Sequence, residues 1–172
     1  MAIDLTLKSN AITNREASPM VHNNPGVGGV ARLQAVQGYL ASVTAALSAT
    51  SVIRMVSVPA HAVITGLTFA SAAQTAGKFN IGVYRTNADG GAVVDEDFFA
   101  TDVDCASAVA LTDVLNESGT NTIAKQNQRL YEALGVSTTP APGTMYDLCL
   151  TVHTTDVTTG TGAVVLKAEF VL

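Results

Sequence analysis

The sequence predicts an all-β protein, an antiparallel jelly roll or β-sandwich with one short helix and an extended N-terminal arm. Apolar and polar residues alternate in several short runs, as in Tyr146, Leu148, Leu150 and Val152 with polar residues between them. A period of two places one set on each face of a sheet. Turn signals separate about seven to nine such runs, and no strand–helix–strand alternation is visible. An antiparallel sandwich follows from this pattern.

The first 34 residues differ in composition from the rest of the chain. Asparagines are scattered through this segment, and the run NNPGVGG spans residues 23–29. Pro25 and the clustered glycines disfavour a regular element. We therefore expect an extended arm over residues 1–34, which orders against a partner, and one sandwich domain over residues 35–172. The chain has 172 residues, which suits a single core.

The first half of the domain predicts a series of short strands. Residues 37–48 fit either a helix or a strand, and the neighbouring pattern favours a strand. Residues 51–58 predict the next strand, and Pro59, which has no N–H to donate, is expected at its end. In the following strand Val63, Thr65, Leu67 and Phe69 are expected on one face. Phe79, Ile81 and Val83 are expected on one face of the strand after it.

The second half continues with turns, one helix and two final strands. Residues 87–91, NADGG, predict a turn in which glycine supplies a positive φ. Residues 95–104 are expected as an acidic, solvated loop, and residues 106–115 as a strand. Residues 122–134 predict the helix, ended by Gly135. Strands are expected from Tyr146 and from Val164, joined by a hairpin loop over residues 154–162.

The charge content bounds the function. Only 13% of residues are charged, against about 25% in an ordinary soluble domain. Such a surface indicates coverage by partner proteins, with a Thr/Ser/Asn-rich solvent face as the alternative. The net charge is −5 and no Lys/Arg cluster occurs, which argues against nucleic-acid binding. No apolar stretch is long enough for a membrane helix. The N-terminus lacks a secretory h-region, so synthesis in a cytoplasm without export is expected.

The sequence offers few candidates for chemistry, and none predicts an enzyme. The carboxylates between Asp95 and Asp104 could bind Ca²⁺ or act as a glycosidase pair, but they lack EF-hand spacing. With five Phe, four Tyr and no Trp, sugar stacking is poorly supplied. His61 is expected in a solvent-facing turn. Cys105 and Cys149 are expected as buried free thiols. No cofactor and no metal site is predicted.

Several blocks of the sequence, in their order, resemble the small proteins that decorate, or cement, the outside of tailed-bacteriophage capsids. These blocks are ITNREASPMVHNN, RMVSVPAHAVITGLTF, GKFNIGVYRTNADGGAVVDEDFFA, QRLYEALG and the ending MYDLCLTVHTTDVTTGTGAVVLKAEFVL. The resemblance covers most of the chain and contains no catalytic signature.

The resemblance implies a non-enzymatic virion protein on the outer surface of a capsid, made in the host cytoplasm. Its expected partners are the major capsid protein and itself, as a homotrimer at the joints between capsid subunits. The arm would then hold the shell, with Arg15, His22, Asn23, Asn24 and Pro25 as the candidate contacts. The alternative is a receptor- or carbohydrate-binding module of a phage tail or fibre, with residues 95–104 as its site.

Overall fold

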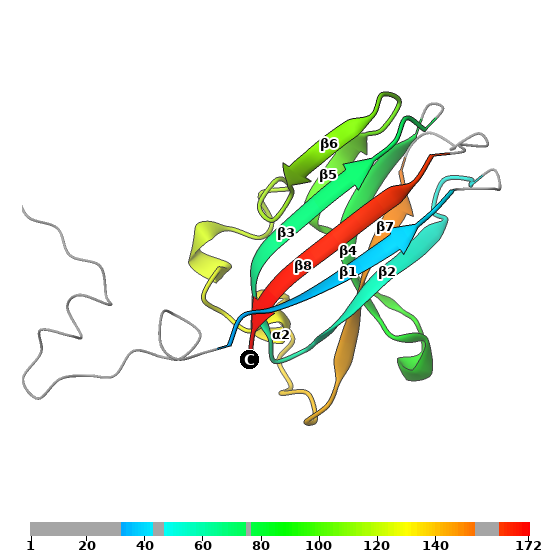
Figure 1. The fold of residues 1–172 in the computed structure, drawn as a ribbon. Coiled ribbons are helices and arrows are strands. Elements are labelled where there is room, and N and C mark those ends of the chain that lie inside the picture. The colour runs from blue at the N-terminus through cyan, green and yellow to red at the C-terminus, as the bar shows by residue number, and fades with distance from the viewer. Residues whose placement is uncertain (1–31, 43–46, 75–76, 154–161) are drawn as a thin grey trace, which may run out of the picture.

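The structure is a computed structural model, and it describes residues 32–42, 47–74, 77–153 and 162–172. Eight strands form two four-stranded antiparallel sheets that pack face to face (Figure 1). The strands are β1 Gln34–Leu40, β2 Val52–Pro59, β3 Val63–Ser71, β4 Lys78–Arg85, β5 Val93–Asp104, β6 Val109–Asp113, β7 Met145–Val152 and β8 Val164–Val171. The predicted all-β sandwich is therefore confirmed.

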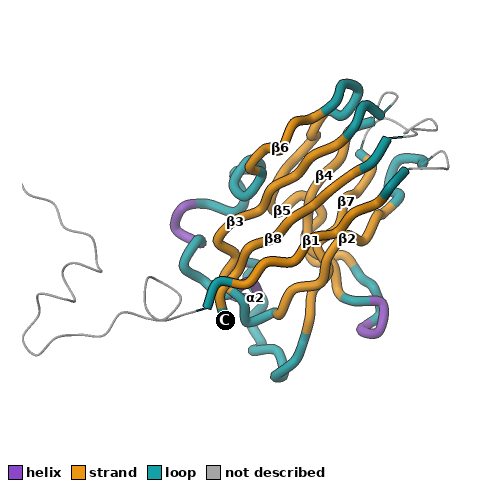
Figure 2. The backbone as a smooth tube through the Cα atoms, in the orientation of Figure 1, coloured by secondary structure: helices purple, strands orange, loops and turns teal. Residues whose placement is uncertain are grey.

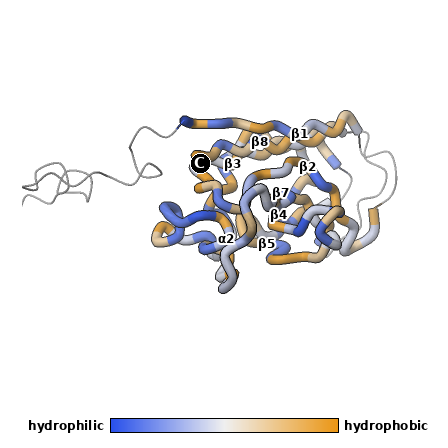
Figure 3. The backbone as a smooth tube through the Cα atoms, turned by 90° about the horizontal axis from the view of Figure 1, so that it is seen from below, coloured by the Kyte–Doolittle hydropathy of each residue, from blue (hydrophilic) through white to orange (hydrophobic). Residues whose placement is uncertain are grey.

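The strand order identifies the sandwich as a jelly roll. One sheet has the order β1-β8-β3-β6 and the other the order β2-β7-β4-β5. The chain therefore crosses between the sheets after β1, β2, β3, β5, β6 and β7. The first and last described strands pair with each other, from Gln34 opposite Phe170 to Leu40 opposite Val164. Eight strands in two such sheets are the arrangement of a jelly roll. Figure 3 shows the two layers, with β1, β8 and β3 on one side and β2, β7, β4 and β5 on the other.

Both sheets turn one apolar face inward. The predicted alternation holds in β7 and β8, whose core residues include Leu148, Leu150, Leu166 and Phe170. The largest fully buried side chains are Phe69, Phe79, Phe98 and Phe99 from β3, β4 and β5, followed by Leu67, Ile81, Leu130, Leu148, Leu150 and Leu166. Burying one such side chain contributes about 1.5–3 kcal/mol. This core fixes the register, because a slip by one residue would turn every apolar side chain outward.

The predicted face of β3 is wrong at its start. Val63, Thr65, Leu67 and Phe69 were expected on one face, but Thr65 is exposed and Ile64 joins the core. The pairing of β3 with β8 shifts register between Ile64 and Gly66. An extra residue in one strand reverses the direction of the side chains on either side of it. Leu67 and Phe69 follow the bulge and point inward, as predicted.

The predicted helix over residues 122–134 is much shorter in the structure. A 3-10 turn, η3, covers Ile123–Lys125, and α2 covers only Leu130–Ala133 (Figure 2). The backbone N–H groups of Leu130 and Tyr131 donate to the carbonyls of Ala62 and Ala60, at 2.8 and 3.1 Å. These bonds tie the start of α2 to the β2–β3 turn and replace an upstream helical turn. Gly135 has φ 73°, as expected just after a helix.

The other turns agree with the sequence. The NADGG segment forms a 3-10 turn, η2 Asn87–Asp89, followed by Gly90 and Gly91 at φ 84° and 66°. Residues 37–40 of the ambiguous first segment lie in β1, so the preference for a strand is confirmed there. Residues 43–46 and the hairpin loop 154–161 lie outside the described residues. Among the residues that the structure describes, no helix is long and apolar enough to cross a membrane.

Candidate interaction surfaces

The outer face of the sheet β1-β8-β3-β6 is the first candidate surface, and we call it the open face. Its inner side is fixed by the core residues of β8, so Val165, Lys167 and Glu169 point outward. The register places rows of residues across the strands. The first row is Tyr39, Val165 and Ala70, and Leu111 lies in the irregular stretch of β6 next to Ala70. The second row is Gln37, Lys167, Thr68 and Asp113, and the third is Ala35, Glu169 and Gly66.

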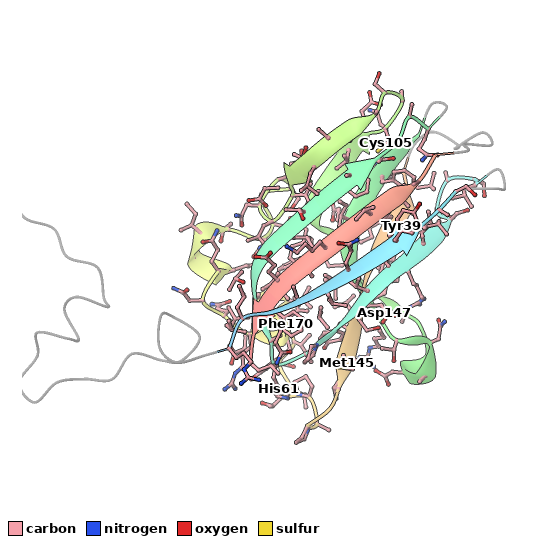
Figure 4. The ribbon with its side chains drawn as sticks, viewed as in Figure 1. Tyr39, His61, Cys105, Met145, Asp147 and Phe170 are labelled. Atoms are coloured by element: carbon pink, nitrogen blue, oxygen red, sulfur yellow. The ribbon has the colours of Figure 1, made fainter. Side chains whose placement is uncertain are left out.

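The first row of the open face is entirely apolar and ends in two exposed side chains. Tyr39 is 64% exposed on the edge strand β1, and Leu111 is 68% exposed on the edge strand β6. Figure 4 shows Tyr39 on β1. The ion pair between Lys167 Nζ and Glu169 Oε1, 2.5 Å apart, adds charge to the middle of the face, and the exposed Asp113 adds a carboxylate on β6. The apolar first row is therefore the part of this face that could contact another protein.

The outer face of the other sheet is closed by its own side chains. Arg54 on β2 donates to Asp147 Oδ2 at 2.7 Å and to the carbonyls of Arg85 and Gly91 at 2.8 and 2.9 Å. Ser57 donates to the other oxygen of Asp147 at 2.5 Å. These bonds join β2, β7, β4 and the η2 turn, so the polar groups on this face are satisfied within the fold.

The same face is also covered by the backbone of β5. Ile81 pairs with Ala100 and Val83 with Asp95, so a step of two residues on β4 matches a step of five on β5, which therefore carries a large bulge. A Cβ added to Gly82 would collide with the backbone of Glu96. Gly82 therefore allows the bulge to cross β4 directly. The bulge also brings both Phe98 and Phe99 into the core, where their ring centroids lie 4.9 Å apart.

The prediction of a solvated acidic loop at residues 95–104 is therefore wrong. These residues belong to β5, because Phe98, Phe99 and Ala100 within them are buried and pull the segment into the sheet. Asp102 accepts a hydrogen bond from His153 Nδ1 at 2.7 Å, and its backbone N–H donates to Asn80. Within the described part of the chain, no three His, Cys, Asp or Glu residues are grouped so that they could hold a metal ion.

Two carboxylates of β5 have pKa values shifted in opposite directions. The hydrogen bond from His153 lowers the pKa of Asp102, with Lys78 adding to the effect. Desolvation raises the pKa of Asp95, and its hydrogen bond with Asp97 raises it further. A carboxylate whose pKa is lowered by folding stabilises the fold at pH values above its ordinary pKa. This stabilisation is lost as the pH falls through the lowered pKa of the folded state. A raised pKa costs stability at neutral pH, and this cost disappears on acidification.

We expect Asp102→Asn to lower the free energy of unfolding at pH 7, and Asp95→Asn to raise it. Asparagine keeps an oxygen acceptor at both positions and tolerates the positive φ of 54° at Asp102. The Asp95 difference should vanish below about pH 3, where aspartate is protonated in the unfolded chain. The Asp102 difference should disappear only at lower pH, where Asp102 is protonated in the folded state as well. Urea unfolding of the two variants at both pH values measures this. Effects of the same sign at pH 7 would contradict the assignment.

Both cysteines are free and buried, as predicted. Burial raises the pKa of Cys105 to about 11 and that of Cys149 to about 12. At neutral pH both are thiols, and a thiol is a poor nucleophile. His61 Nε2 lies 3.0 Å from the carbonyl oxygen of Pro140, and its ring packs edge-on against Tyr131. These contacts give His61 a structural role at the β2–β3 turn.

A shallow groove lies between the η2 turn and the loop before β7. Its larger part has a volume of about 410 Å³, and an adjoining part of about 220 Å³ shares Asp89 and Thr144 with it. An ion pair between Arg85 and Asp89, 3.6 Å apart, crosses its wall. Tyr146 is the one aromatic residue of its lining and is itself buried. The groove therefore offers no exposed ring on which a sugar could stack.

The predicted shell contacts Arg15, His22, Asn23, Asn24 and Pro25 lie outside the described residues, as does the arm over residues 1–31. The open face was not identified from the sequence, although its members are visible there. The signal was an alternating strand whose outward positions are small or apolar, as in Tyr39 of β1 and Val165 of β8. Pairing of β1 with β8, which no local pattern reveals, is what joins these positions into one surface.

Comparison with known proteins gives likeness in structure alone. No protein-family model matches the sequence, and no curated protein matches it. A chain of the cyanophage Pam1 capsid asymmetric unit is similar with a TM-score of 0.52 and 13% identity, over 91% of this chain and 96% of that one. A chain of the capsid of Ralstonia phage GP4 is similar with a TM-score of 0.57 and 11% identity, over 81% and 84%. The fold of this protein is therefore one that occurs in phage capsids.

Proposed function

We propose that this chain is a non-enzymatic structural protein of a bacteriophage virion that binds the outside of the capsid. In this role it stabilises the joints between major capsid subunits, as a trimer. The observation that carries the proposal is the jelly-roll fold, shared with chains of two phage capsids over most of their length. The low charge content and the apolar open face support a protein that works in contact with other proteins.

The mechanism requires binding and no chemistry. A protein that binds across a joint only in the assembled shell lowers the free energy of that assembly by mass action. A trimer on a three-fold site repeats each contact three times, so weak contacts combine through effective concentration. The buried thiols and the bonded His61 favour this reading over an enzymatic one. The missing aromatic platform in the groove at η2 disfavours the carbohydrate-binding alternative.

The test uses phage particles assembled without this chain, mixed with the purified full-length protein. We expect saturable co-sedimentation at a fixed copy number per particle and a higher melting temperature of the particles. Free major capsid subunits are the control and should bind far more weakly. Failure to bind particles would overturn the proposal, as would equal binding to free subunits. Binding to host cells or glycans in place of particles would favour a receptor-binding module.

A further inference from the structure

We propose that residues 3–7 of this chain add as a fifth strand to the free edge of β6. The segment reads Ile-Asp-Leu-Thr-Leu and lies outside the described residues, whereas β6, Val109–Asp113, lies within them. An extended segment that adds to an open sheet edge is bound through backbone hydrogen bonds. Such binding needs no capsid, so it goes beyond the proposed function.

Four strands lie at the edges of the two sheets, and β6 has the edge best suited to a further strand. β1 and β2 cover each other, because a Cβ added to Gly38 of β1 would collide with the backbone of Met55 of β2. The pairing of β5 with β4 shifts register at three points, so β5 offers no straight row of backbone groups. β6 ends the row β1-β8-β3-β6, with no described strand beyond it in that sheet (Figure 1).

The end of β6 directs backbone groups away from β3. The N–H of Val114, just after β6, donates to the carbonyl of Leu67 on β3 at 2.8 Å, and Thr112 also pairs with β3. Because neighbouring residues of a strand direct their N–H and C=O groups to opposite sides, those of Asp113 point to the free side. β6 is short and bulged before Thr112, and four of its five residues are exposed. Its edge therefore suits a short segment.

Residues 3–7 match β6 in length and have the pattern of a strand. Their three apolar residues alternate with polar ones, which is the period of two typical of a strand. Residues 9–31 hold no second run of this kind, because asparagines, prolines and glycines interrupt them. Leu5 is the middle residue of the segment and Leu111 the middle residue of β6, so the two side chains meet whichever way the segment runs. Leu111 is 68% exposed, and this contact removes it from water.

The part of the chain that contains β5 and β6 is strongly acidic. Residues 86–124 contain no lysine or arginine and eight carboxylates, Asp89, Asp95, Glu96, Asp97, Asp102, Asp104, Asp113 and Glu117. Three lysines lie nearby: Lys78 and Lys167 are paired with Asp102 and Glu169, and Lys125 lies over the ring of Phe98. Two copies joined through β6 would bring like charges together, so the β6 edge of a second copy is disfavoured as the occupant.

The charge of the segment is compatible with this acidic edge. Residues 3–8 carry one carboxylate, Asp4, and one cation, Lys8, so they add no net negative charge. Carboxylates stand on both sides of β6, with Asp104 before it and Asp113 at its end. Lys8 follows the segment directly, so it lies toward one of these carboxylates in either direction of the added strand.

The connecting chain allows residues 3–7 to reach β6 of their own chain. The 26 residues from 8 to 33 join the segment to β1, which starts at Gln34. Fully extended, they span about 85 Å. A fifth strand lies four strand spacings from β1, about 19 Å across the sheet. A flexible tether holds the segment at a millimolar effective concentration, roughly a thousandfold above a second copy at micromolar concentration. We therefore assign the segment to β6 of the same chain.

The first experiment tests the contact by oxidation of paired cysteines. In a chain carrying Leu5→Cys and Leu111→Cys, we expect a disulfide within the chain that forms at least about tenfold faster than in two control chains. The controls combine Leu5→Cys with Tyr39→Cys on β1 or with Val93→Cys on β5, whose native side chains are 64% and 55% exposed. Tyr39 is much closer to Leu5 along the chain, so an unbound tether would favour that control pair.

Mass spectrometry of the digested, unreduced chains identifies each disulfide, and dilution separates bonds within a chain from bonds between chains. The native chain is a further control, because Cys105 and Cys149 are buried and should not react. Equal rates for the three pairs would overturn the proposal. A bond between positions 5 and 111 that forms only between chains would overturn the assignment to the same chain.

The second experiment measures hydrogen exchange at the free edge. Leu5→Asp places a charge in the apolar side of the segment and is expected to raise the exchange rate of the Asp113 N–H at least about tenfold. The N–H of Val114, which is bonded to β3, should keep its rate. Ile12→Asp is the matched variant, because it makes the same kind of change outside the segment. Unchanged exchange at Asp113 in Leu5→Asp would overturn the proposal, as would an equal increase in Ile12→Asp.

Both experiments use the purified protein without particles, so their outcomes are separate from the test of the proposed function. A disulfide between positions 5 and 111 in a protein that does not bind particles would support this contact and overturn the proposed function. Binding to particles without that disulfide would overturn the contact and leave the proposed function standing.

Discussion

Removal of residues 1–30 is expected to leave the sandwich folded and to lower its apparent affinity for particles by at least about 100-fold. The first described strand, β1, begins at Gln34, so the truncated chain retains every strand and every core residue that the structure describes. The resemblance to capsid decoration proteins implies that the arm holds the shell, and a trimer would carry three arms. Losing all three removes the multivalent gain, which is typically 10² to 10⁴ in affinity.

Co-sedimentation with particles measures the loss, and the unfolding midpoint and mass of the truncated protein serve as controls. A second variant keeps the length of the chain and replaces Arg15, His22, Asn23, Asn24 and Pro25 by alanine. We expect it to lose part of the affinity, because these are the predicted shell contacts. Full binding by the truncated protein would show that the sandwich itself holds the shell, which contradicts the assignment of the arm.

Replacement of Asp147 by alanine is expected to lower the free energy of unfolding by about 3 kcal/mol. Asp147 is buried on β7 and accepts hydrogen bonds from Arg54 and Ser57. Without it the Arg54 guanidinium remains among β2, β4 and the η2 turn with no carboxylate to neutralise it. An unpaired charge in a partly buried site costs more than the pair contributes, and for this reason the effect exceeds that of an ordinary hydrogen bond.

Chemical unfolding followed by circular dichroism measures this effect. Ser57→Ala is the matched control, because it removes one bond to the same carboxylate and leaves the ion pair in place. We expect it to cost about 1 kcal/mol. Equal effects of the two substitutions would contradict a dominant role for the ion pair. Asp147 lies on the outer face of the sheet β2-β7-β4-β5, so Asp147→Ala should leave the mass of the folded oligomer unchanged.

The strands with strict alternation could be predicted from the sequence, and those with bulges could not. In β7 and β8 every second residue is apolar, so both their extent and their inward face follow from the pattern. In β3 the shift after Ile64 reverses the face, and nothing in the local sequence marks it except Gly66. In β5 four aspartates and a glutamate outweigh the apolar residues between them. Their position in a strand depends on the core contacts of Phe98 and Phe99.

The predicted helix was too long and the open face was not predicted for a related reason. Both depend on contacts between residues that are distant in sequence. Residues 122–134 have helical propensity, but the N–H groups of Leu130 and Tyr131 bond to Ala62 and Ala60, which confines the helix to one turn. Tyr39 and Leu111 lie more than half a domain apart along the chain. Only the sheet order β1-β8-β3-β6 places them on one surface. Before the pairing was known, the sequence could not show whether these two side chains were exposed or buried.

The central position of β8 has a consequence for the order of events in folding. β8 lies between β1 and β3, so neither of these strands has its inner neighbour until residues 164–171 have been synthesised. Pairing β1 with β8 closes a loop of more than a hundred residues, and such closure must precede the contacts that reward it. We therefore expect the sheet to form only after β8 has been synthesised, on the millisecond-to-second scale of non-local β proteins. During that interval β1 and β3 present free edges, which makes the nascent chain most prone to aggregation before it can assemble.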